Sequence, residues 1–261
     1  MSRGAGEPGL GCNLGGYQMA RSVPPATIVI CATLPQQLRA ERCADLVRGA
    51  AGLPVPVTWV TAIDRLADVG AEILRGVETA DVAVQVPVAE CASRQRLRQF
   101  LVRARQALPS LAAAALRGPA AFEHRALLVG EGIGVVLVDA LDEQSLGLRR
   151  PAPRGWPCRN TAWGLWEVEA GQPRTSAWTN WLGLCGLPRP RAGSLHVVRT
   201  DGAMVGNNGA GFLTSRLERW AAWAEKRCRR GGAVATTLSG LGNTLASGGR
   251  GPLAGSVLRA A

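Results

Sequence analysis

Histidine is scarce in this chain, in which only His124 and His196 occur among 261 residues. Imidazole is the side chain that most often acts as a general base near neutral pH. His196 lies in the apolar run 195–198, and we place it at the end of a strand, where Asp201 or Glu123 could pair with it. The alternative is a histidine that only hydrogen-bonds to its surroundings. For His124 we expect a surface or helix-capping role.

Two charged residues, Arg117 and Asp139, directly follow stretches that we predict to be strands. Barrel enzymes place their active sites at the carboxyl ends of parallel strands. A guanidinium there can clamp a carboxylate, so Arg117 is either a brace within the site or a ligand contact, and Asp139 has the same two interpretations. We therefore name His196, Asp139 and Arg117 as candidate catalytic residues, and Glu90 as a further carboxylate that contacts the substrate.

Tryptophans crowd the irregular stretch between residues 139 and 191. A stretch of this length without regular structure is usually a functional insertion or a lid. Aromatic rings stack on sugars and bases and attract cations, while the alternative is that they anchor a long loop. The tryptophans of this stretch are Trp156, Trp163, Trp166, Trp178 and Trp181. We take the first three as candidate substrate-binding residues.

Several familiar sites are missing from the sequence. The seven cysteines lie at least twelve positions apart, so zinc-knuckle and C-x-x-C spacings are absent, and reduced, buried thiols are expected. Residues 206–211 are glycine-rich but lack a Walker lysine, and no G-x-S-x-G motif surrounds a serine. We expect neither a metal ion nor an organic cofactor.

The chain is basic, with 30 arginines and lysines against 19 acidic residues and a net charge of +11. Its single lysine is Lys226. A nucleic-acid surface needs its basic residues gathered on one face, whereas these arginines are spread over every segment. Nucleic acid is therefore not expected as a partner. The alternative is DNA binding through the arginine-bearing helices at 94–105 and 216–230, which salt would weaken.

Short apolar runs recur about every 25–35 residues, with helical patterns between them, as an alternating α/β fold requires. Strands are expected at 26–32, 54–60, 80–86, 132–138, 195–198 and 233–238, with 111–116 ambiguous between strand and helix. A short extended piece is also expected at 163–168, within the irregular stretch. Helices are expected at about 35–50, 62–75, 93–108 and 212–230. Parallel strands joined by right-handed crossovers follow from this order. We predict a (β/α)7–8 barrel rather than an open doubly wound sheet, since no glycine-rich turn follows the first strand.

The domain organisation expected is one barrel over residues 26–249, with an irregular Trp/Pro-rich insertion at about 140–193. Residues 1–25 and 250–261 are expected to be a disordered lead and a flexible tail. The first 25 residues lack the apolar core of a signal peptide, and the run 26–34 is too short to span a bilayer. We expect a cytoplasmic protein without a membrane partner.

The order of several motifs over residues 26–245 resembles the polysaccharide deacetylase (NodB-homology) family. ICATLP at Ile30–Pro35 occupies the position of the family's T-F-D-D-G-P motif, and QVPVA at Gln85–Ala89 that of H-[S/T]-x-x-H. LRGP at Leu116–Pro119 resembles the R-x-P motif, and Leu195–His196 the late Leu-His motif. Weaker similarities lie at 57–60, 94–108, 127–136 and 237–241. The resemblance implies a deacetylase-like barrel and a carbohydrate or acetylated glycan as ligand.

The same resemblance implies that the metal site has been lost. Ala32 and Thr33 stand where the family has two aspartates, a catalytic base and a metal ligand, and Gln85 and Ala89 stand at its two histidines. Alanine has no ligating atom, and neutral oxygens bind a divalent ion weakly. We expect a carbohydrate-binding or regulatory pseudoenzyme. The alternative is an active hydrolase, acting on C–N or ester bonds of carbohydrates, with a site rebuilt around His196.

Overall fold

The structure, a computed structural model, describes residues 24–35, 38–76, 80–116, 124–138, 158–161, 164–170, 190–200 and 209–247. These residues form one sheet with the strand order β6-β7-β5-β4-β3-β2-β1-β8, and β9 also pairs with β1. The strands are β1 Ala26–Thr33, β2 Val57–Thr61, β3 Ala80–Val86, β4 Ala113–Leu116, β5 Val135–Val138, β6 Cys158–Asn160, β7 Trp166–Glu169, β8 Leu195–Thr200 and β9 Ala233–Thr236. All strand pairs are parallel except β6–β7.

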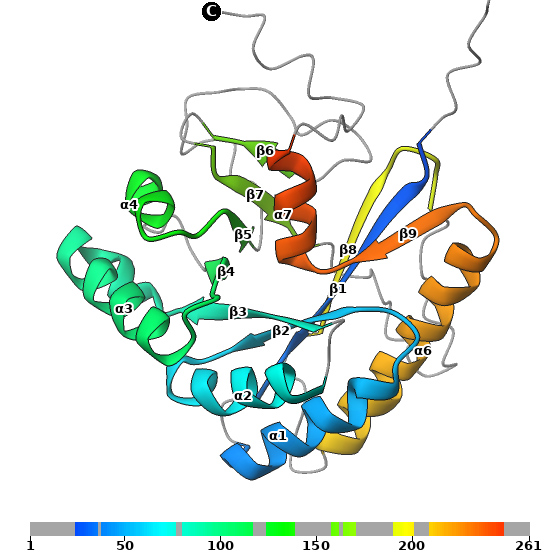
Figure 1. The fold of residues 1–261 in the computed structure, drawn as a ribbon, viewed down its shortest axis with the longest axis horizontal. Helices are drawn as coiled ribbons and strands as arrows, with labels where there is room; N and C mark the ends of the chain where they lie inside the picture. Colours follow the sequence, from blue (N-terminus) through cyan, green and yellow to red (C-terminus); the bar gives the residue numbers. More distant parts are fainter. Residues whose placement is uncertain are drawn as a thin grey trace, which may run out of the picture.

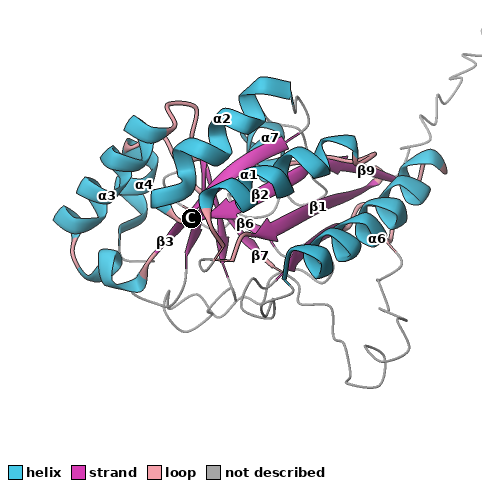
Figure 2. Ribbon diagram, turned by 90° about the horizontal axis from the view of Figure 1, so that it is seen from below, coloured by secondary structure: helices cyan, strands magenta, loops and turns pink. Residues whose placement is uncertain are grey.

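The helices lie on both sides of this curled sheet. They are α1 Ala40–Gly49, α2 Leu66–Gly76, α3 Arg94–Ala107, α4 Arg125–Gly130, α6 Gly209–Arg229 and α7 Leu238–Ala246, with short 3-10 segments η1 Ala50–Gly52, η2 Ile63–Arg65 and η3 Val88–Ala92. The sheet bends into a half-barrel, with α1, α2, α3 and α6 outside the curve and α7 inside it (Figure 1). Figure 2 looks onto the outer helices.

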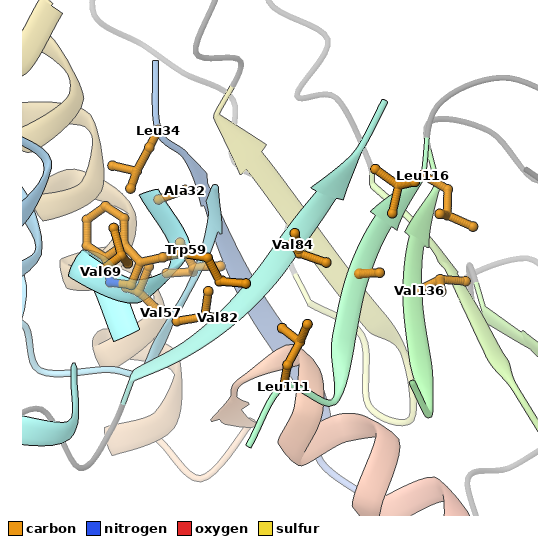
Figure 3. Close-up of a cluster of buried hydrophobic side chains, with 14 of the residues drawn as sticks. Ala32, Leu34, Val57, Trp59, Val69, Val82, Val84, Leu111, Leu116 and Val136 are labelled. Atoms are coloured by element: carbon orange, nitrogen blue, oxygen red, sulfur yellow. The ribbon is translucent and has the colours of Figure 1, made fainter. Parts of the chain in front are cut away.

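The central strands are buried on both faces, which explains why their sequences are continuous apolar runs. In β1, Val29 and Cys31 belong to the inner core under the concave face, whereas Ile28 belongs to the outer core beneath the helices. Figure 3 shows part of the outer core, including Trp59 and Val84. Alternation of side chains along each strand therefore decides which residues point into the half-barrel.

Helix α7 fills the concave face of the sheet. Its buried side chains are Leu238, Leu241 and Leu245, and all three belong to the inner core. A Cβ at Gly242 would lie 3.1 Å from Cβ of Val135 on β5, so glycine permits the close approach of helix to strand. The helix supplies apolar side chains that would otherwise have to come from further strands.

The predicted α/β fold built on a curled, mostly parallel sheet is confirmed, as a half-barrel. Within the stretch expected to be irregular at about 140–193, β7 overlaps the extended piece predicted at 163–168, and β6 is a further short strand. The strand expected at 195–198 is longer than predicted and continues to Thr200. Polar residues end the apolar run at Val198, but sheet pairing with β1 continues to Thr200.

The expected terminal segments 1–25 and 250–261 lie outside the described residues, apart from 24 and 25. In the described part of the chain, no helix is both long and apolar enough to cross a membrane. Cys31, Cys43, Cys91 and Cys158 are free and buried, as expected for reduced thiols.

Candidate functional site

The carboxyl ends of β1 and β8 meet at the edge of the sheet where the sequence predicts the site. Ala32 pairs with Thr200 across the two strands. The backbone N–H of Thr33 donates to Oγ1 of Thr200 at 2.9 Å, and both threonines are buried. This bond extends the pairing of the strands to their last residues and fixes the position of Thr33.

Arg199 places a positive charge at this point. It lies on the same side of β8 as Leu195 and Val197, which are inner-core residues. Its Nε donates to Oγ1 of Thr33 at 3.0 Å. The side chain of Thr33 is therefore already hydrogen-bonded to a cation.

Cys31 precedes Thr33 by two residues in β1, so its thiol lies on the same face of the strand. Burial raises the pKa of this thiol to about 12, although the charge of Arg199 opposes the shift and that of Asp81 adds to it. Because only a thiolate is a competent nucleophile, Cys31 is a neutral packing residue at neutral pH.

Deeper in the half-barrel, the first turn of α7 is capped by side chains from β2 and β3. The N–H of Leu238 donates to Oγ1 of Thr58 at 2.7 Å, and the N–H of Ser239 donates to Oδ2 of Asp81 at 2.8 Å. Burial raises the pKa of Asp81, while the hydrogen bonds from Ser239, Val82 and Thr58 act in the opposite direction. Asp81 thus has a structural role, since it holds α7 in place.

The residues at the strand ends do not fit a metal ion. Thr33 and Gln85 offer only neutral oxygens, Ala32 is part of the outer core, and Ala89 is exposed. Among the described residues, no three His, Cys, Asp or Glu side chains gather in a way that could hold one. The contact between Arg199 and Thr33 adds a positive charge where a cation would have to bind.

His196 does not lie at the end of a strand, so its expected place is wrong. It is the second residue of β8 and pairs with Ile28 at the amino end of the sheet. Its Nε2 lies 2.8 Å from Oγ of Ser194, and burial lowers the pKa of the imidazole. Because β8 continues for four residues after His196, this residue lies near the opposite end of the strand from Thr200.

The other described candidates also lie apart from one another. Glu90 is in η3, directly after β3, and pairs with Arg103 at 3.8 Å. Trp166 is the first residue of β7, at the amino end, where it packs half-buried against the inner core. His124 directly precedes α4 and its side chain makes no capping hydrogen bond. Arg117, Asp139, Trp156 and Trp163, together with Glu123 and Asp201, lie outside the described residues and stay predictions.

Four residues of this region, Arg199, Thr200, Thr58 and Asp81, are not among the residues predicted from the sequence. A two-residue period would have indicated two of them. Arg199 follows Leu195 and Val197 on one face of β8, and Asp81 precedes Ala83 on one face of β3. Nothing local predicts that Thr58 and Asp81 meet the first turn of α7, since more than 150 residues separate them.

Comparisons with known proteins give a likeness of fold. No family model matches the chain, and no curated protein does. A protein assigned as a polysaccharide deacetylase from Mycobacterium smegmatis is similar over 87% of this chain and 92% of its own, with 11% identity and a TM-score of 0.53. Peptidoglycan deacetylase PdaC from Bacillus subtilis is 10% identical over 84% of this chain and 92% of its own, with a TM-score of 0.43. The chain therefore has the fold of the polysaccharide deacetylases, as the order of its motifs predicted.

Proposed function

We propose that this protein is a polysaccharide deacetylase-like carbohydrate-binding or regulatory protein that does not use metal-dependent catalysis. The observation that supports the proposal is the hydrogen bond from Nε of Arg199 to Oγ1 of Thr33. In this fold, the strand ends are the place for ligand chemistry. Among the described residues at that place, Arg199 is a fixed cation, and Thr33 and Gln85 are neutral. A cytoplasmic location is part of the proposal.

Electrostatics shows how strongly the guanidinium opposes a metal ion. A divalent ion on the hydroxyl of Thr33 would lie close to the charge of Arg199. At a distance of about 4 Å and an effective dielectric constant of about 20, the repulsion is about 8 kcal/mol. A structural zinc site with a full set of ligands gains about 10–16 kcal/mol. Two neutral oxygens supply much less than a full set, so binding of the ion is unfavourable.

The same groups suit a neutral sugar. The guanidinium of Arg199 donates hydrogen bonds, and the amide of Gln85 both donates and accepts. Gln85 follows Ala83 on the concave face, near the carboxyl end of β3, and is half-buried. Hydroxyl and acetamido groups of a glycan can bond to such side chains without any reaction taking place. The proposed role is therefore binding rather than turnover.

Two measurements with an N-acetylglucosamine hexamer test this function. Calorimetry is expected to show binding, and replacing Gln85→Ala should weaken it about five- to tenfold, because a hydrogen bond is lost. Gln95→Ala is the matched control, since Gln95 is exposed on α3, and it should leave the affinity unchanged. Acetate release in the presence of Zn²⁺ should not exceed that of the buffer. Chelator-sensitive acetate release, or the absence of binding, would contradict the proposal.

A further inference from the structure

A hollow of about 740 Å³ lies along the outer side of α3, away from the strand ends where Arg199 contacts Thr33. Part of its lining comes from Ala89 and Glu90 of η3, and the rest from α3. Because η3 directly follows β3, the hollow begins near the carboxyl end of that strand. The lining residues from α3 are exposed, so the hollow opens to solvent. Figures 1 and 2 show α3 in the layer of helices outside the curve of the sheet.

Arginine and glutamine alternate along the floor of the hollow. Arg96, Gln99, Arg103 and Gln106 all line it and follow one another at intervals of three, four and three residues. Residues at these intervals share one side of a helix. The pattern repeats after seven residues, which is a rise of about 10 Å along the axis. This spacing is longer than a single small anion spans, and it suits an extended chain.

Positive charge dominates this surface. Arg96, Arg98 and Arg103 line the hollow against one acidic residue, Glu90. The pair between Arg103 and Glu90 is 3.8 Å long, and the side chains are 60% and 29% exposed. Such exposed pairs contribute little to stability, so an anionic ligand can compete for Arg103. The second pair, between Arg98 and Glu131, is also exposed on its arginine side.

We propose that this hollow binds an acidic polysaccharide in which charged sugars alternate with neutral ones. Guanidinium groups match carboxylates in bidentate geometry. The amides of Gln99 and Gln106 match the hydroxyl or acetamido groups of the neutral sugars between them. No described residue that lines the hollow is aromatic, whereas binding of single-stranded nucleic acid relies on stacked bases. The inference rests on the carbohydrate-binding function proposed above and gives it a ligand class and a second surface.

The test measures binding of an octasaccharide of alternating glucuronate and N-acetylglucosamine to the full chain. Arg96→Gln and Arg103→Gln should each weaken binding about five- to tenfold through loss of a charged hydrogen bond. Glutamine suits a helix as well as arginine does, so folding should not change. Glu90→Gln removes the opposing charge and should strengthen binding. Arg42 is an exposed residue of α1. Arg42→Gln therefore removes the same charge at a distant position and should have no effect on binding.

Four results would overturn the inference. The first is that the octasaccharide does not bind, and the second is that Arg42→Gln and Arg96→Gln weaken its binding equally. The third is that oligo(dT) binds with the same dependence on Arg96 and Arg103. The fourth is that only Arg199→Met abolishes octasaccharide binding, which would place the acidic ligand at the strand ends beside Thr33. Failure of the proposed function is separate, because metal-dependent acetate release would leave the effects of Arg96 and Arg103 in place.

Discussion

Two buried threonines of β2 differ in what their hydroxyl groups do. Oγ1 of Thr58 accepts the N–H of Leu238, whereas Oγ1 of Thr61 has no hydrogen-bond partner among the described residues. Both side chains are almost fully buried. A buried hydroxyl without a partner costs free energy, and removing the acceptor of a buried N–H costs more.

Valine at each of these positions tests the difference. We expect Thr58→Val to lower the free energy of unfolding by about 1–3 kcal/mol, because the N–H of Leu238 loses its acceptor. Thr61→Val should be neutral or stabilising. Urea denaturation of the two variants gives the comparison. Equal losses in both would show that the hydroxyl of Thr58 does not hold α7.

Single residues of the site were predicted only in part. The placement of Thr33 and Gln85 near strand ends could be predicted, because an apolar run followed by a polar residue shows where a buried strand finishes. Arg199 could not be predicted in the same way, because the apolar run of β8 ends at Val198 and the last two residues of the strand are polar. The expected place of His196 is wrong for the same reason. In a strand that ends at Val198, His196 is close to the carboxyl end, whereas the observed strand continues to Thr200.

Three elements at one edge of the sheet are joined by a buried ion triad. Glu167 of β7 is fully buried, and its two carboxylate oxygens accept from Nε of Arg125 on α4 at 2.5 Å and from Nε of Arg159 on β6 at 2.6 Å. Carboxylate oxygens that each bond a different guanidinium connect the three elements through one side chain. The three-residue β6 is held both by its antiparallel pairing with β7 and by this contact.

Breaking the triad should destabilise the fold strongly. We expect Glu167→Gln to lower the free energy of unfolding by about 3–5 kcal/mol, because two guanidinium groups remain without their carboxylate. Glu225→Gln is the control: Glu225 pairs with Arg229 one turn away on α6, and such exposed pairs contribute about 0.3–0.5 kcal/mol. A loss of similar size in both variants, measured by urea denaturation, would contradict this account.

Among the elements, amphipathic helices were the most predictable. The helix predicted at 93–108 is α3, Arg94–Ala107, and its apolar stripe and the capping hydroxyl of Ser93 are local signals. Strand β7 overlaps the extended piece predicted at 163–168, whereas β6 has no local signal, because a three-residue strand exists only through its pairing. Helix α7 was missed, since its leucine stripe begins two residues after β9 ends and the predicted last strand overlapped it.

At the scale of the whole molecule, the fold is that of the polysaccharide deacetylases, whereas the absence of metal chemistry at its strand ends is our proposal. The half-barrel has the architecture of the polysaccharide deacetylases at only 11% identity to the M. smegmatis protein. Core positions tolerate many apolar residues as long as size and pattern are kept, whereas a metal site requires particular ligands. A fold therefore does not fix a function. The proposal that metal chemistry is absent here rests on the contact between Arg199 and Thr33.

The metal content of the purified protein tests this account most directly. After dialysis against Zn²⁺ and removal of the excess, elemental analysis should find far less than one zinc ion per chain. A variant carrying Thr33→Asp, Gln85→His and Arg199→Met restores two ligands and removes the cation, so it should retain more zinc than the native protein. One tightly held zinc ion per native chain would contradict the account.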